Sequence, residues 1–182
     1  IGVDPHQLIT EHLVMDPTVR DGAAVADVER DILKIAVIER HKGTGNIGVG
    51  FAHGFGLRSG AIASTVGHDA HNLAVLGTND ADMLAAARAV AEAGGGQCVA
   101  QGGEILAMLP LPIAGLMSDL DAETVIEQQA HLLDAARELG CPHEDPFMPL
   151  SFTPLPVIPH LKITDLGLVD VDAFEVVPIE TR

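Results

Sequence analysis

The sequence predicts an α+β (mixed α/β) fold, built as one sheet-centred domain with two main helices and a glycine-rich loop region. Short apolar runs typical of strands, of which residues 32–38 are the clearest, outnumber the stretches with helical spacing. The two helical stretches follow most of the strand-like runs, and residues 43–60 contain too much glycine for a regular helix. A chain of 182 residues suits a single domain, here residues 1–182.

The first strands are predicted from alternation and from β-branched side chains. Residues 7–14 alternate enough to predict a strand with one solvated face, and Asp21-Gly22 predicts a turn. The run at residues 32–38 is apolar almost throughout, which is typical of a strand covered on both faces. We expect residues 43–60, which follow it, to form a structured loop.

The middle of the chain predicts two more short strands and a hairpin. Residues 61–66 and 73–76 are apolar and flank the polar insertion 67–72. Residues 97–100 and 104–109 are separated by a Gly-Gly pair, which is typical of a hairpin turn.

Helical spacing is clear in two places. The first helix is expected to begin with Asp80 as its N-cap and to end at the glycines 94–96. The second runs from near Asp121 to Leu139 and ends at Gly140. The last forty residues are proline-rich and are expected to close with two short strands, around Val169 and at 174–179.

Charge and composition exclude several classes of function. The formal net charge is −16, with ten Lys and Arg residues that form no basic cluster, so we expect neither nucleic acid nor an anionic membrane as a partner. No apolar run approaches the ~20 residues that a membrane-spanning helix needs, and no signal peptide is recognisable. Cys98 and Cys141 are expected to be reduced and buried, which indicates the cytoplasm, although one disulfide between them stays open.

The segment from Gly43 to Gly48 spells G-x-G-x-x-G. In a dinucleotide-binding site this turn opens a helix whose N-terminus faces the pyrophosphate. Gly50, Gly54 and Gly56 follow here and would make a poor helix. We therefore favour a glycine-rich loop that allows close backbone packing over nucleotide binding.

The cluster with the most candidate ligand side chains is His68-Asp-Ala-His71, followed by Asn72. Imidazole and carboxylate groups suit zinc, iron or manganese, so His68, Asp69 and His71 are weak metal candidates. Further ligands would have to come from Glu39 and His41. An exposed polar loop whose side chains bond the backbone is favoured over a pocket or interface role, and both over a metal site. Arg40 and Lys42 make a small basic spot that could receive an anion, although a solvated loop tip is the default.

Several stretches resemble the adenine deaminase family in order along almost the whole chain. Residues 38–50, read as IERHKGTGNIGVG, are similar to that family's "ERHxGTGNIGxG" segment. Matches continue at Gly54-Phe-Gly-Leu57, at His68-Asp-Ala-His-Asn72, at Gly77-Thr-Asn-Asp80, at residues 109–119 and at residues 146–159. One departure is Thr65-Val66-Gly67, where the family usually has Ser-Val-Ala.

The resemblance implies the carboxyl-terminal domain of an enzyme that deaminates adenine to hypoxanthine and ammonia in purine salvage. That family belongs to the amidohydrolase superfamily, and its iron or manganese centre lies in a (β/α)8 barrel that activates water. The barrel's ligands begin with an H-x-H motif, which is absent here. We therefore expect no catalytic residue and no bound metal cofactor in this chain, which alone should be inactive. The expected partners are the protein's own N-terminal barrel domain and a purine substrate, in a homo-oligomer.

The resemblance also marks a polar surface on this domain. The matching polar positions are expected to face the barrel mouth and to close or shape the adenine pocket: Glu39, His41, Asn46, His68, Asp69, His71 and Asn72, with Gly43 among them.

Two other functions stay open. The domain could be a structural or oligomerisation module that packs on the barrel through residues 106–117 and touches no substrate. It could also be a stand-alone metal-binding protein, which would rest on His68 and His71 alone.

Overall fold

A six-stranded antiparallel sheet forms the centre of the computed structural model, which describes residues 1–180. Its strand order is β4-β3-β6-β5-β7-β8, and every neighbouring pair is antiparallel. The strands are β3 (Ile32–Ile38), β4 (Ile47–His53), β5 (Ala61–Ser64), β6 (Leu73–Gly77), β7 (Gly96–Gln101) and β8 (Glu104–Pro110). This confirms the predicted sheet-centred α+β class.

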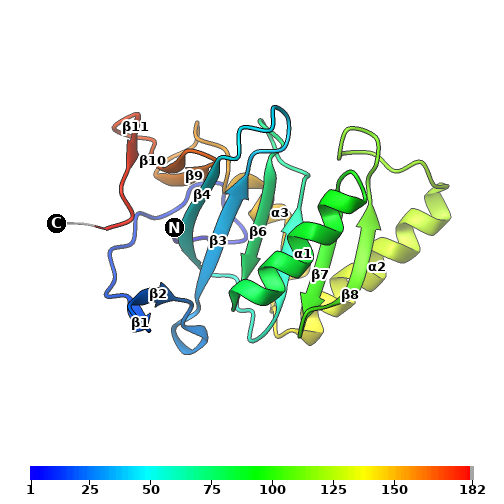
Figure 1. The fold of residues 1–182 in the computed structure, drawn as a ribbon, viewed down its shortest axis with the longest axis horizontal. Helices are drawn as coiled ribbons and strands as arrows, with labels where there is room; N and C mark the ends of the chain where they lie inside the picture. The colour runs from blue at the N-terminus through cyan, green and yellow to red at the C-terminus, as the bar shows by residue number, and fades with distance from the viewer. Residues whose placement is uncertain (181–182) are drawn as a thin grey trace.

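Two smaller sheets flank one end of the central sheet (Figure 1). A hairpin of β1 (Thr18–Arg20) and β2 (Ala23–Val25) turns at Asp21-Gly22, as predicted, and a short 3₁₀ helix (Val28–Arg30) follows it. A three-stranded sheet has the order β11-β10-β9, with β9 (Leu161–Thr164), β10 (Gly167–Asp170) and β11 (Glu175–Val177). The two predicted terminal strands are thus β10 and β11, whereas β9 was not predicted.

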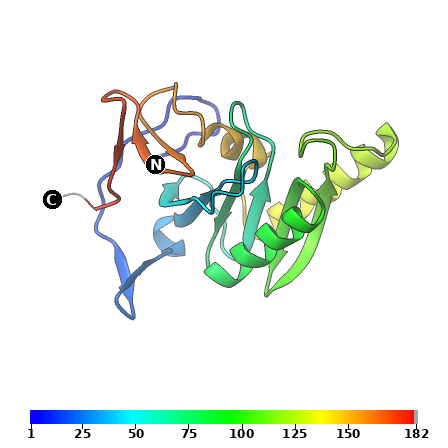
Figure 2. The same ribbon diagram turned by 45° about the horizontal axis from the view of Figure 1, so that its top comes forward.

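Helices cover both faces of the central sheet (Figures 1 and 2). The helix α1 (Asp80–Glu92) lies on one face, and α2 (Ala122–Glu138) lies on the other beside β8 and β7. The short helix α3 (Phe147–Phe152), which was not predicted, packs against β5 and β6. Among residues 1–180, no helix combines the length and the apolar character that a bilayer crossing requires.

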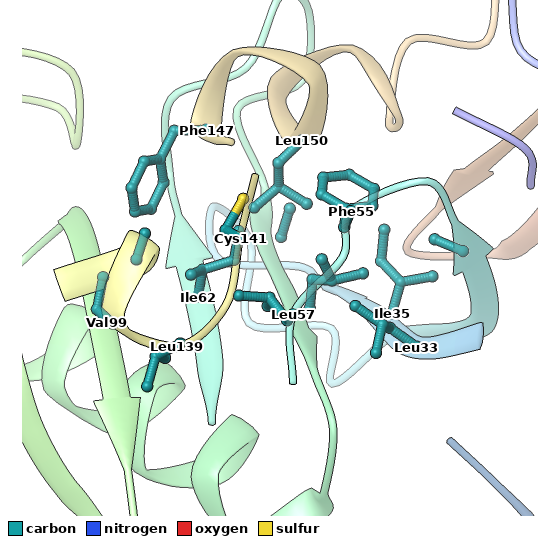
Figure 3. Packing of buried hydrophobic residues seen from close by; sticks show 14 of the residues in the cluster. Leu33, Ile35, Phe55, Leu57, Ile62, Val99, Leu139, Cys141, Phe147 and Leu150 are labelled. Carbon is teal, nitrogen blue, oxygen red and sulfur yellow. The ribbon is translucent and has the colours of Figure 1, made fainter. Parts of the chain in front are cut away.

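The strand register sorts the apolar side chains into two cores. Ile35, Leu76, Ile62 and Val99 are register partners across β3, β6, β5 and β7, and all belong to the larger core. Figure 3 shows part of this core, in which Phe55, Leu57, Phe147 and Leu150 pack beside the sheet. The next row across the same strands lies under α1: Ala36, Val75, Ala63 and Cys98. Small side chains in this row let α1 approach the sheet closely.

Residues 7–14 do not form the predicted strand. They run as an extended arm in which Leu8 and Ile9 are about half exposed and Val14 is 69 % exposed. The arm is held by Thr10, whose amide donates to the Pro159 carbonyl and whose hydroxyl donates to the Leu161 carbonyl. Alternation alone was a poor guide, because a strand also needs a neighbouring strand to bond with.

The glycine-rich stretch was only partly predicted. A loop was expected throughout residues 43–60, but Ile47–His53 forms the edge strand β4. A Cβ on Gly48 would lie 1.9 Å from the Thr164 carbonyl oxygen, and one on Gly50 would lie 3.0 Å from Leu168 Cδ2. Gly48 and Gly50 therefore allow the β9–β10 hairpin to pack directly on β4, which confirms the close-packing interpretation at Gly48, whereas a Cβ on Gly43 or Gly45 would meet nothing within 4 Å. The G-x-G-x-x-G segment leads into a strand and not a helix, so it does not make a pyrophosphate site.

The other predicted elements are confirmed, with one change of cap. β3, β5, β6, the β7–β8 hairpin and both main helices lie where the sequence places them. The N-cap of α1 is Asn79 and not Asp80, because the Asn79 side chain accepts the Asp82 amide hydrogen. Cys98 and Cys141 are free and buried, and burial raises the pKa of both thiols, to about 12 for Cys98.

Candidate functional site

The antiparallel topology gathers several loops at one end of the central sheet, which we call the loop end. The β3–β4 loop (residues 39–46) and the β5–β6 loop (residues 65–72) lie next to each other there, since β3 pairs with both β4 and β6. The segment after β8 (residues 111–121) starts at the same end, because Pro110 is the register partner of Gly96. The candidate residues predicted from sequence all lie on the first two of these loops.

Glu39 shapes its own loop and does not point toward a ligand. Its carboxylate accepts hydrogen bonds from the amides of His41, Lys42 and Thr44, and from the Thr44 hydroxyl. The amide of Thr44, followed by those of Lys42 and His41, lowers the pKa of Glu39 from 4.5 to about 2. This carboxylate therefore stays ionised and organises the 39–46 loop at neutral pH.

His41 and Arg40 join the two loops. The Nε2 atom of His41 donates to the Ala70 carbonyl at 2.6 Å, since a carbonyl can only accept, and this leaves Nδ1 available. Arg40 reaches both the 65–72 loop and the segment after β8. Its Nε donates to the His71 carbonyl at 2.7 Å and its Nη2 to the Ala114 carbonyl at 2.6 Å. Of the predicted basic spot, the Arg40 guanidinium is thus bonded to two backbone carbonyls and not free for an anion at Nε or Nη2.

A carboxylate that the sequence did not indicate ties both loops to the three-stranded sheet. Asp165, in the β9–β10 turn, accepts a hydrogen bond from Asn46 Nδ2 at 3.0 Å and another from Asn72 Nδ2 at 3.2 Å. Asn72 is 8 % exposed, and its Oδ1 has no hydrogen-bond partner among the described residues. The two asparagines therefore fix the bases of the loops and do not reach into solvent.

The remaining candidates lie at the rim of the loop end. His68 is exposed and its ring stacks on Phe152 of α3, with centroids 3.7 Å apart and planes at 25°. Asp69 is also exposed. His71 has a left-handed backbone, φ 50°, and its Nδ1 accepts the Gly67 amide hydrogen at 3.3 Å. The sequence cluster is therefore split, since His68 and His71 turn to different partners.

The geometry does not fit a metal ion. Within residues 1–180, no group of three or more His, Cys, Asp or Glu side chains gathers in a way that could hold one. His68 stacks on an aromatic ring, His71 Nδ1 is bonded to an amide, and Glu39 is bonded to its own loop. The described residues therefore offer no ligand set for iron or manganese.

The segment after β8 lies against the β5–β6 loop. The Thr65 hydroxyl donates to the Gly115 carbonyl at 2.7 Å and accepts from the Gly96 amide at 2.8 Å. Part of the docking surface expected at residues 106–117 is core, because Leu109 and Leu111 are buried. Exposed apolar side chains begin at Ile113 and continue at Met117, Leu120 and Ile126.

The chemistry available at the loop end is hydrogen bonding and stacking. His41, His68 and Asp69 offer imidazole and carboxylate groups, which can recognise the donors and acceptors on a polar heterocycle. We find no group there arranged to activate water, because the one carboxylate with a large pKa shift, Glu39, is held ionised by amides.

Sequence reasoning missed Asp165, Phe152 and the role of Arg40. Asp165 is 119 residues from Asn46 and 93 from Asn72, so no spacing pattern could connect them.

Known proteins match this chain along almost its whole length. A family model described as "Adenine deaminase C-terminal domain" matches residues 7–175. This chain belongs to the adenine deaminase C-terminal domain family. Proteins named adenine deaminase from Desulfatibacillum aliphaticivorans and Oleidesulfovibrio alaskensis are 57 % and 55 % identical, over 98 % and 100 % of this chain. One from Methylobacterium sp. is 53 % identical over 98 % of it.

The adenine deaminase C-terminal domain is only part of each relative. The chain covers 32 % of the Desulfatibacillum and Oleidesulfovibrio proteins and 31 % of the Methylobacterium protein. Since the chain covers about a third of each relative's length, the remaining two thirds are consistent with a partner domain.

Proposed function

We propose that this domain is the C-terminal part of an adenine deaminase and that its loop end closes or shapes the adenine pocket. In this arrangement the N-terminal part supplies the (β/α)8 barrel, the iron or manganese and the activated water. The C-terminal domain supplies the rim: His41 on one loop, and His68 and Asp69 on the other. The product of the intact enzyme is hypoxanthine, with release of ammonia, in purine salvage in the cytoplasm.

The main support is that the fold brings two separate polar loops together and fixes them from below. The 39–46 and 65–72 loops touch through His41 and Ala70, and Asp165 holds the asparagine at the base of each. Polar side chains held on rigid strand ends are what a substrate pocket requires, because positioning errors of about 1 Å reduce catalysis strongly. A purely solvated pair of loops needs no such framework.

The proposed division of chemistry is supported by the lack of a metal ligand set within residues 1–180. A divalent ion supplies the catalysis by lowering the pKa of bound water, and it must be held by several protein ligands. This domain contributes hydrogen bonds and excludes solvent. Alone it should release no ammonia from adenine.

Reconstitution tests the proposal. The chain is co-expressed with the N-terminal part of the Desulfatibacillum adenine deaminase, and ammonia release is measured for the separate parts and for the mixture. We expect activity only in the mixture. The double variant His68→Ala/His71→Ala should lower kcat/KM by roughly tenfold or more, equivalent to ~1.4 kcal/mol, with little change in melting temperature. His131→Ala, on the exposed face of α2, is the matched control.

Unchanged kinetics in the double variant would reject a pocket role for these loops. A mixture with no activity, although both parts are folded, would count against the proposed function as a whole. Ammonia released by the isolated chain would contradict the division of chemistry.

A second candidate function is a structural or oligomerisation domain. It is favoured by the exposed apolar side chains that run from the segment after β8 onto α2, namely Ile113, Met117, Leu120 and Ile126. Replacing Met117 and Ile126 with Ser should then weaken assembly of the reconstituted enzyme while the loop-end variants leave kcat unchanged. Sedimentation velocity measures the first effect and the kinetic assay the second.

A further inference from the structure

Arg40 lies where three segments of the loop end meet. It is the second residue after β3, and its guanidinium bonds one carbonyl on the 65–72 loop and one on the 111–121 segment. The third neighbour is Gly115, where an added Cβ would lie 2.4 Å from the Arg40 Nη2. The guanidinium therefore fills the space that a Cβ at residue 115 would take, and the φ of 74° at this residue also favours glycine.

Both carbonyls that Arg40 binds belong to residues with a left-handed backbone. His71 has φ 50° and Ala114 has φ 59°. Non-glycine residues in this region are strained, and they persist only where the surroundings hold them. Hydrogen bonds from a charged donor are stronger than neutral ones, so the two bonds from Arg40 help to hold both conformations.

The geometry of the contact requires a guanidinium and not only a positive charge. Nε and Nη2 diverge toward two different segments, and the planar fork fixes their angle. A lysine ammonium is a single point donor, so it cannot reproduce both bonds with the same geometry. Partial burial also lowers the pKa of Arg40, but a guanidinium remains charged at any pH of interest.

We propose that Arg40 is a positioning residue for the candidate pocket: it locks the 65–72 loop, which carries His68 and His71, against the segment that begins the exposed apolar surface. The inference rests on the proposed function and adds a specific link to it. A partner that contacts Ile113 or Met117 would, through Ala114 and Arg40, also set the position of His71. The known contacts of the segment through Thr65 lie deeper and do not reach His71.

The test compares Arg40→Lys and Arg40→Ala with Arg88→Lys, an exposed arginine on α1. In the reconstituted enzyme, both Arg40 variants should lose roughly tenfold in kcat/KM, and lysine should not rescue the loss. In the isolated domain, NMR should show the Gly67 amide and the His71 ring shifted in both Arg40 variants. The amides of α1 and α2 should remain at their positions. Arg88→Lys should match the wild type in every measurement.

Wild-type kinetics in Arg40→Lys, or an unshifted Gly67 amide, overturn this inference and leave the proposed function standing. Chemical shift changes spread through α1 and α2 overturn it as well, because they mean a general structural role. If the wild-type mixture releases no ammonia, the proposed function fails, and this inference fails with it.

Discussion

Replacing Gly48 with Ala should destabilise the protein strongly, because β4 and the β9–β10 hairpin touch at this residue. The added Cβ would lie 1.9 Å from the Thr164 carbonyl oxygen, 2.9 Å from the Gly167 nitrogen and 3.1 Å from the Gly167 Cα. All three atoms are backbone atoms, and Thr164 and Gly167 are register partners in the β9–β10 ladder. No flexible side chain can move aside, so the hairpin must shift by more than 1 Å, on the order of the overlap itself.

The magnitude follows from overpacking. Extra atoms in a well-packed contact typically cost 1–3 kcal/mol, and a backbone clash belongs at the upper end, so we expect ~3 kcal/mol. For a chain of this length each kcal/mol lowers the melting temperature by about 2–4 °C, which gives a fall of about 6–12 °C. Calorimetry and urea unfolding followed by circular dichroism measure both quantities.

Gly67→Ala is the matched control for this prediction. Its Cβ would meet no atom closer than 3.7 Å, and its φ is not in the left-handed region. We expect a change within about 1 kcal/mol, with stabilisation the favoured sign because alanine restricts the unfolded chain. A Gly48→Ala protein that melts within about 2 °C of the wild type would refute the close contact between β4 and the hairpin.

Three further predictions concern charged groups. Asp165→Ala removes the acceptor for both Asn46 and Asn72, so the free energy of unfolding measured in urea titrations should fall by about 2–3 kcal/mol. A change near zero would mean that water replaces the Asp165 carboxylate as a hydrogen-bond partner of both asparagines at no cost. Burial lowers the pKa of Lys162 from 10.5 to about 8, so the unfolded chain binds more protons than the folded one between these pH values. The free energy of unfolding of the wild type should therefore rise from pH 8 to 10.5 relative to that of Lys162→Met. Parallel plots of unfolding free energy against pH for the two proteins would contradict this. The pKa of Glu39 falls from 4.5 to about 2 in the folded state, so its contribution to stability is present above pH 4.5 and is lost as the pH falls toward 2. Glu39→Gln should lack this loss of stability in acid unfolding. NMR titration of the wild-type Glu39 carboxyl should give a midpoint near 2.

Most of the secondary structure could be predicted because its signals are local. β3 has a nearly continuous apolar run rich in β-branched residues, α1 and α2 have helical spacing with polar caps, and a Gly-Gly pair turns the β7–β8 hairpin. These patterns act within a few residues of the chain. The order of the motif segments also indicated the family, which the family model confirms over residues 7–175.

The failures share a cause, which is that a distant segment decided the outcome. Residues 7–14 had strand-like alternation, but their backbone bonds are isolated ones, from Thr10 to residues 159–160 and from Glu11 to Gly2, and do not make a continuous ladder. Residues 47–53 looked like loop because of their glycines, yet they form β4, since the glycines face the β9–β10 hairpin more than 100 residues away.

By itself, the sequence determined which segments are strands and helices, which loops are polar and which family the chain belongs to, because these properties depend on neighbours along the chain. Only the tertiary structure decided what the polar residues do. His68 and His71 are close in sequence but turn to different partners, whereas Asn46 and Asn72 meet at Asp165. Hydrogen-bond partners are set by distance in space, and for these loops that distance is fixed by the pairing order of the sheet.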